Sequence, residues 1–186
     1  MNALLKFSDG SRRVLESIAI ASGWLLLMMA AVTCFDVVAR KTGIPAPLTK
    51  LQELEWHFHA VLFSMWMGYG YTVNAHPRVD SFTEKMAWRR RAWIELWGCL
   101  LFALPYCALV AYFSIEFVVN SFNLGEQSDS MVGLKYRWAI KGLYAAGLWL
   151  VVLGILSVAA RVIVFLFGGR EHANLDLPIG HTELDI

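Results

Sequence analysis

The sequence predicts an all-α integral membrane protein with four long transmembrane helices. Apolar residues make up 58% of the 186 residues and charged residues only 17%, and the apolar residues form long blocks rather than periodic stripes. One such block fills residues 58–73, between Glu53 and Glu55 at its start and Asn74 at its end. A helix over 56–75 would rise about 30 Å, the thickness of the hydrocarbon core of a bilayer. We therefore expect one membrane domain over 14–168.

The first thirteen residues precede the first apolar block and carry a mixed pattern. Leu4, Leu5 and Phe7 lie among charged residues such as Lys6 and Asp9. This pattern fits a short interfacial helix lying on the membrane surface, and it also fits a solvated, flexible arm. Both interpretations remain open for 1–13.

The first transmembrane helix is predicted over 14–39. Asp36 and Arg40 are four residues apart at its far end, so they share a helix face and can form an ion pair. The segment that follows contains Gly43, Pro45 and Pro47, which disfavour helix. We expect a short turn outside the membrane there.

The second helix is predicted over 53–76 and carries a row of small residues. They recur every four positions, as Ala60, Ser64, Gly68 and Thr72. Such a row lets a neighbouring helix approach closely. The neighbour can belong to this chain or to a partner protein.

The remaining helices are predicted over 92–122 and 138–167, with a polar segment before the first of them. That segment ends in Arg89, Arg90 and Arg91, which we expect to contact anionic lipid headgroups. Pro105 should kink the helix over 92–122. Residues 169–186 are polar and are expected to form a flexible tail.

The distribution of Lys and Arg predicts the orientation. The side that holds both termini and the middle loop carries ten of them, and the other side carries six. Cytoplasmic loops are enriched in Lys and Arg, so we expect both termini in the cytoplasm.

The composition argues against several classes of function. A net charge of +1 makes nucleic acid an improbable partner. His57, His59 and His76 all belong to the second helix, so facing helices cannot supply two axial haem ligands. His57 and His59 point about 200° apart around a helix and cannot chelate one ion. We expect no metal, no cofactor and no catalytic residues, and hence no enzyme.

The order of polar features along the chain resembles a known family, the small membrane subunit (DctQ-like, Q subunit) of tripartite ATP-independent periplasmic (TRAP) transporters. The resemblance covers about 14–167. It is carried by these residues: Arg40, Pro45 or Pro47, the run LQELEWH over 51–57, HPRVD over 76–80, GEQS over 125–128, Gly133, Leu134, Trp138 and Lys141. The residues from the second loop onward, which are GEQS, Gly133, Leu134, Trp138 and Lys141, resemble the branch described for mannitol, chloroaromatic or keto-acid substrates.

The resemblance implies a division of labour among subunits in a bacterial inner membrane. A large membrane subunit would hold the substrate and sodium sites and move as an elevator, and a periplasmic binding protein would deliver an organic anion. This chain would then be a static, multi-pass scaffold in contact with both partners and with membrane lipids. The competing hypothesis is a membrane anchor of a redox enzyme, with or without haem, and a third is an autonomous small transporter.

Within the leading hypothesis, three sets of polar residues receive expected roles. A cluster at the periplasmic mouth would hold the first turn in shape: Asp36, Arg40, Glu53 and Glu55. A cluster at the cytoplasmic mouth would position the other end of the second helix: His76, Arg78 and Asp80. Charges on the periplasmic loops would dock the binding protein: Lys50, Glu126, Asp129 and Lys135.

Overall fold

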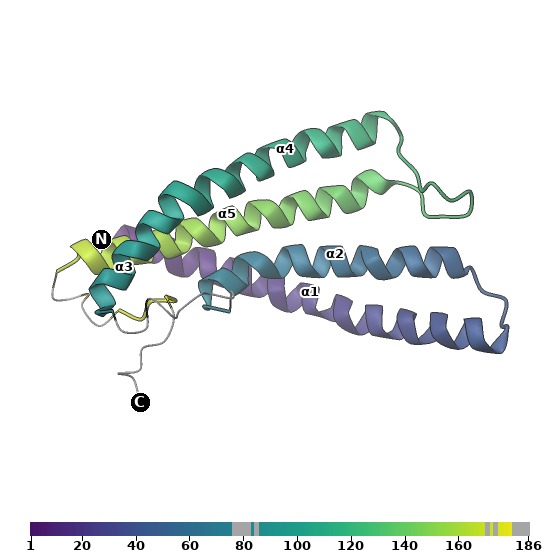
Figure 1. Cartoon of the computed structure of the whole chain (residues 1–186), viewed down its shortest axis with the longest axis horizontal. Coiled ribbons are helices and arrows are strands. Elements are labelled where there is room, and N and C mark those ends of the chain that lie inside the picture. Colours follow the sequence, from purple (N-terminus) through teal and green to yellow (C-terminus); the bar gives the residue numbers. More distant parts are fainter. Residues whose placement is uncertain (76–82, 84–85, 170–171, 173–174, 180–186) are drawn as a thin grey trace.

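The computed structural model describes residues 1–75, 83, 86–169, 172 and 175–179, and this part of the chain is helical with short connections. The elements are α1 (Asn2–Thr42), α2 (Leu48–Thr72), α3 (Trp88–Gly98), the π-helical segment η2 (Cys99–Ala103), α4 (Leu104–Asn123) and α5 (Arg137–Phe167). Figure 1 shows an elongated bundle with the start of α1 and the end of α5 at one end, which we call the terminal end. At the opposite end, the loop end, the turn 43–47 joins α1 to α2 and the connecting loop 124–136 joins α4 to α5.

Helix α5 is the central element of the bundle, because α1, α2, α3 and α4 all pack against it. Val158, Val162 and Val164 of α5 are almost completely buried, as is Leu15 of α1. The main core cluster joins α5 to Ala92, Leu96 and Cys99 of the α3–η2 region near the terminal end. Helix α4 packs chiefly on α5, which leaves much of its surface uncovered.

Helix α1 begins at Asn2, so the separate arm predicted over 1–13 is instead the first part of one 41-residue helix. The reason lies in packing against α5. Ser8 is 2% exposed and Ser11 is 7% exposed, and the Ser8 and Ser157 hydroxyls are 3.2 Å apart. The helix ends at Gly43, whose φ of 70° is the left-handed conformation that terminates many helices.

The helix predicted over 92–122 is present as three consecutive helical segments. The Leu104 N–H donates to the carbonyl of Cys99, five residues earlier, which closes the π-helical turn. Pro105 has no N–H to continue a regular α-helical ladder, so the irregularity falls immediately before it. The predicted break at Pro105 thus takes the form of a π-helical segment.

Three helical stretches, not four, are both long enough and apolar enough to cross a membrane among the described residues: Asn2–Thr42, Trp88–Asn123 and Arg137–Phe167. Helix α2 has 25 residues and runs beside α1, but it contains no stretch of membrane-spanning length that is as apolar as those of the other three. Glu53, Glu55, His57 and His59 make its first half polar. The prediction of four transmembrane helices is therefore supported for three of them.

The predicted flexible tail contains a packed segment. Leu177 and Ile179 are each 3% exposed and belong to the main core cluster. Burial of these two aliphatic side chains stabilises the packing of the segment against the bundle through the hydrophobic effect. Residues 175–179 are therefore part of the folded domain.

Candidate functional site

The row of small residues on α2 packs against α5 of the same chain. A Cβ atom added at Gly147 would lie 2.5 Å from the Cβ of Ser64. One added at Gly154 would lie 2.5 Å from the carbonyl oxygen of Gly68. Glycines on both helices thus permit an approach that side chains would prevent. At its two ends, the row continues with half-buried Ala60 and with Thr72, which is 4% exposed.

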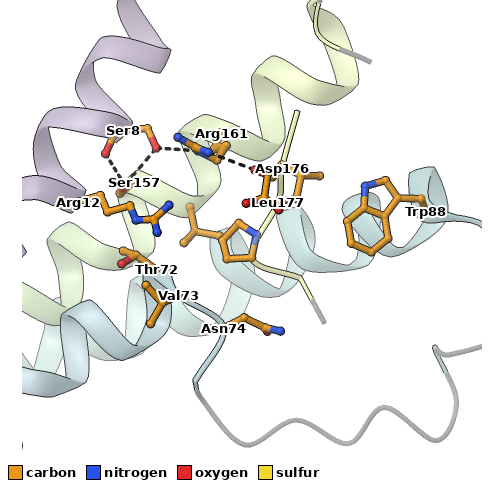
Figure 2. Close-up of a pocket in the computed structure, with 12 residues that line it drawn as sticks. Ser8, Arg12, Thr72, Val73, Asn74, Trp88, Ser157, Arg161, Asp176 and Leu177 are labelled. Atoms are coloured by element: carbon orange, nitrogen blue, oxygen red, sulfur yellow. Dashed lines mark hydrogen bonds between the residues drawn. The ribbon is translucent and has the colours of Figure 1, made fainter. Parts of the chain in front are cut away.

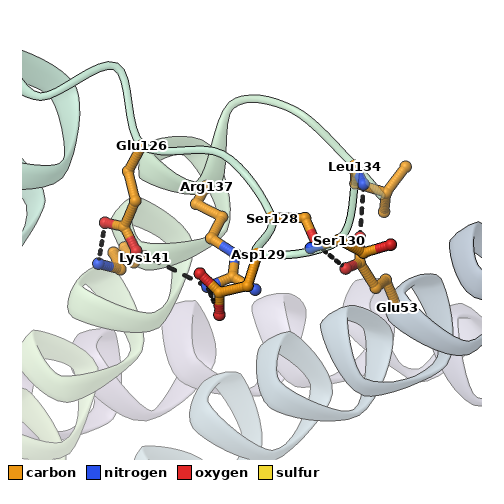
Figure 3. Close-up of polar contacts among 8 residues, drawn as sticks. All are labelled: Glu53, Glu126, Ser128, Asp129, Ser130, Leu134, Arg137 and Lys141. Carbon is orange, nitrogen blue, oxygen red and sulfur yellow. Dashed lines mark hydrogen bonds and ion pairs between the residues drawn. The ribbon is translucent and has the colours of Figure 1, made fainter. Parts of the chain in front are cut away.

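At the loop end, Glu53 attaches the connecting loop to α2 (Figure 3). Its carboxylate accepts hydrogen bonds from the Ser128 hydroxyl and from the Leu134 backbone N–H. A Cβ atom at Gly133 would lie 2.6 Å from one Glu53 oxygen and 2.2 Å from the Ser128 hydroxyl. Glycine at this position therefore leaves the room that the Glu53 carboxylate occupies. We call these contacts the Glu53 clamp.

A second set of contacts holds the connecting loop to the start of α5. Glu126 pairs with Lys141 and lies 3.8 Å from the guanidinium of Arg137, which is also 3.8 Å from Asp129. The Lys141 ammonium lowers the pKa of the Glu126 carboxyl below its ordinary value. Lys141 also sits 3.9 Å from the centre of the Phe117 ring on α4. These contacts connect the loop, α4 and α5 at one point.

The four residues predicted to form one periplasmic-mouth cluster are only partly associated. Arg40 interacts with Asp36 and is close enough to Glu55 for charge attraction, whereas Glu53 contacts the connecting loop. Arg40 donates to Asp36 at 2.7 Å on α1, as their spacing predicts. Glu53 is engaged with the connecting loop instead. Glu55 has one buried oxygen without a hydrogen bond among the described residues. Glu53 is drawn away from the cluster because the connecting loop folds back onto α2, and the spacing of residues in the sequence does not predict that contact.

The predicted docking charges also differ in availability. Lys50, Asp129 and Lys135 are exposed at the loop end. Glu126 is half-buried and occupied by its contacts with α5. It therefore holds the loop, whereas Lys50 and Lys135 are exposed, and Asp129 is exposed although it lies 3.8 Å from Arg137.

The three consecutive arginines in the first turn of α3 have different surroundings. Arg89 donates to the carbonyl of Leu166 at the end of α5, at 3.1 Å. Arg91 is 3% exposed and lies 5.5 Å from the ring centre of Trp88. Only Arg90 is both exposed and without an assigned contact in the described part of the chain. The predicted basic cluster for lipid headgroups is thus reduced, because successive helical residues diverge by about 100°.

His76, Arg78 and Asp80, predicted to form the cytoplasmic-mouth cluster, lie outside the described residues. The terminal end does contain a polar network that the sequence analysis missed. Arg161 of α5 pairs with Asp9 and donates to the carbonyl of Asp176 at 3.1 Å.

The burial of the start of α1 had a signal in the sequence. Small and aliphatic residues recur every three or four positions along the start of α1, and these are its buried positions: Ser8, Ser11, Leu15, Ala19 and Ser22. That spacing marks a helix face made for close packing. This packed face extends toward the N-terminus, into residues 1–13, which were predicted to form a separate arm.

The described residues contain no group of three or more His, Cys, Asp and Glu side chains that could hold a metal ion. His57 bonds to the backbone carbonyl of Glu53, and His59 stacks on Phe63 with ring centres 6.3 Å apart. The polar side chains at the loop end are arranged as contacts between elements. This arrangement suits a structural or docking surface.

Comparison with known proteins is consistent with this picture. The family model described as "Tripartite ATP-independent periplasmic transporters, DctQ component" matches residues 29–165. Comparisons with curated proteins and with solved structures gave no match. The matched residues run from the middle of α1 almost to the end of α5, and so include α2, both loops and the Glu53 clamp. The chain therefore belongs to the DctQ-component family of tripartite ATP-independent periplasmic transporters.

Proposed function

We propose that this chain is the static scaffold subunit of a sodium-coupled TRAP transporter that imports an organic anion across the bacterial inner membrane. It would support a large elevator-type membrane subunit and help to dock the periplasmic binding protein. Helix α2 would be the fourth crossing, with its polar first half shielded by α1 and the connecting loop. Both termini would then be cytoplasmic and the loop end periplasmic, as the Lys and Arg distribution predicts.

The observation that carries this proposal is the uncovered apolar face along η2 and α4. Phe102, Tyr106, Leu109 and Phe113 recur at helical spacing and are between 54% and 73% exposed. Their helix packs chiefly on α5, so the opposite face has no neighbour from the described part of the chain. In a membrane such a face contacts lipid or a partner helix, and aromatic residues supply large contact area to a partner.

The loop end supports the docking part of the proposal. Met131, Val132 and Leu124 of the connecting loop are at least 60% exposed, and they lie near the exposed charges of Asp129 and Lys135. Exposed apolar side chains among charges are typical of protein interaction sites. The Glu53 clamp would hold this surface in one conformation, which lowers the entropic cost of docking.

Site-specific photo-crosslinking tests the scaffold role. A photoreactive amino acid is placed at Phe113 on α4 and, as a matched control, at Leu27, which is 61% exposed on α1. With the large subunit co-expressed, we expect a crosslink to that subunit from position 113. A chain that purifies as a stable monomer, with no crosslink from either position, would contradict the proposal.

Reconstitution tests the transport role. Proteoliposomes with both membrane subunits and the binding protein should take up the organic anion only with an inward sodium gradient. Vesicles that lack this chain, or contain it alone, should show no uptake. Uptake by this chain alone would instead identify it as an autonomous transporter.

A further inference from the structure

A cavity of about 350 Å³ opens at the terminal end, between α1, α2, α5 and the segment 175–179 (Figure 2). Trp88, Val158 and Leu177 give it an apolar side. Its polar side consists of Ser8, Arg12, Thr72, Asn74, Ser157, Arg161 and one carboxylate residue, Asp176. Its volume lies within the range of about 300–1,000 Å³ found for small-molecule sites. The mixture of two guanidinium groups with hydroxyl and amide groups suits a small polar anion.

The two arginines of the cavity differ in how their charge is compensated. Arg161 pairs with Asp9 and donates to the Asp176 carbonyl. Arg12 lies one helical turn after Ser8 and extends into the cavity (Figure 2). Within the described part of the chain, no carboxylate or carbonyl accepts a hydrogen bond from the Arg12 guanidinium. Asp176 is therefore the carboxylate of the cavity wall left to balance Arg12, and it makes no hydrogen bond to that guanidinium.

A second group in the cavity also lacks a partner. The side-chain oxygen of Asn74 is buried and has no hydrogen bond among the described residues. Asn74 follows α2 in the left-handed conformation, with φ of 58°. A buried polar atom of this kind costs free energy until something bonds to it. A ligand with a hydrogen-bond donor, such as a hydroxyl group, would satisfy this oxygen once the Asn74 side chain turns it toward the cavity.

We propose that this cavity binds a phosphate ester that carries a small hydroxylated group, with Arg12 as the main contact to the phosphate and Asn74 as the contact to a hydroxyl. Arginine matches phosphate geometry with two parallel hydrogen bonds. Water alone would fill the volume but would bring no negative charge to Arg12. The phosphate can come from a phospholipid headgroup such as phosphoglycerol or from a soluble phosphate ester. The inference does not depend on the transporter role.

The Asp176 carboxylate would repel a bound anion, so one substitution in the cavity should strengthen binding and another should weaken it. Asp176 borders the cavity and is exposed at the surface. Removing its charge leaves the backbone carbonyl that Arg161 uses. Asp176→Asn should therefore tighten binding, whereas Arg12→Gln should weaken it.

The test uses the full chain in neutral detergent with two probes. Phosphatidylglycerol binding is followed by native mass spectrometry, and binding of radiolabelled glycerol 3-phosphate is followed by equilibrium dialysis. Arg12→Gln should weaken binding about tenfold or more, the loss expected for one charge-assisted hydrogen bond. Arg13→Gln is the matched control, because Arg13 makes the same charge change but is exposed and does not line the cavity.

The two probes separate the sources of phosphate. Arg12-dependent binding of phosphatidylglycerol alone identifies a lipid headgroup site, and Arg12-dependent binding of glycerol 3-phosphate identifies a soluble ligand. Either result supports the proposal. Binding of neither probe, or equal loss in Arg12→Gln and Arg13→Gln, overturns it. If Arg12→Gln does not fold, the Asp176→Asn arm decides, and unchanged or weaker binding there overturns the proposal.

Discussion

The contact between α2 and α5 makes Gly68→Ala a sensitive test of the packing. A methyl group added at Gly68 would lie 2.4 Å from the carbonyl oxygen of Leu150 and 2.7 Å from its carbonyl carbon. It would also lie 3.1 Å from a terminal carbon of Leu15 on α1. The nearest obstacle is backbone, which cannot rotate away as a side chain can. The helices must therefore move apart.

The expected loss of stability follows from this geometry. Ordinary carbon–oxygen contacts are about 3.3–3.6 Å, so α2 and α5 must separate by roughly 1 Å at this point. Overpacking of a well-packed core costs about 1–3 kcal/mol, and the upper part of that range applies because the obstacle is backbone. Alanine recovers up to about 1 kcal/mol through its better helix propensity. The net effect on the free energy of unfolding is a loss of about 2 kcal/mol, or a Tm lower by about 4–8 °C.

Thermal unfolding of the purified chain in detergent measures this loss, with Gly70→Ala as the matched control. Gly70 lies two residues away in the same helix, and an added Cβ there would have nothing within 4 Å. Its Tm should stay constant or rise slightly through helix propensity. Equal Tm values for the two variants would refute the packing argument. An unchanged Tm for Gly68→Ala together with weaker binding to the large subunit would mean that the row faces a partner.

Three further predictions concern the loop end. Glu53→Gln should weaken both hydrogen bonds of the Glu53 clamp, since hydrogen bonds to charged groups are worth about 1.5–3 kcal/mol each, and limited proteolysis should then cut the connecting loop faster. Because Lys141 lowers the pKa of Glu126, their pair stabilises the fold above the unfolded-state pKa and is lost as the pH falls through the lower folded-state value. The Tm of the wild type should therefore fall more steeply below about pH 4 than that of Glu126→Gln. Arg40→Ala should lower the Tm more than Asp36→Ala. Arg40→Ala leaves the carboxylate of Asp36, which is 7% exposed, without its partner, whereas Asp36→Ala leaves the Arg40 side chain, which is 44% exposed and stays hydrated.

The helical architecture was largely predictable because it depends on local composition. Long apolar blocks predicted α1, α4 and α5, and Pro105 predicted the irregularity that became the π-helical segment. The pair of Asp36 and Arg40 was predictable from a spacing of four on one helix. Features of this kind require only the geometry of a single helix.

The errors concern residues whose surroundings come from distant parts of the chain. The sequence leaves the start of α1 open between an interfacial helix and a flexible arm, and it predicts a flexible segment over 175–179, because it shows no packing partner for either. Their partners are on α5, more than a hundred positions from Ser8. The same reason separates Glu53 from the predicted mouth cluster, since Ser128 and Leu134 reach it only after the connecting loop folds back.

The sequence by itself determined that this is a helical membrane protein, where its main helices lie, and which family it resembles. These properties follow from hydrophobicity, from helical spacing and from the order of polar residues along the chain. Only the tertiary structure decided that the small residues of α2 pack against α5 of the same chain. It also decided that the Glu53 clamp holds the loop end and that Arg12 lines a cavity at the terminal end. The physical reason is that close backbone approach, burial and charge compensation are properties of pairs of helices, and a pair exists only once the chain has folded.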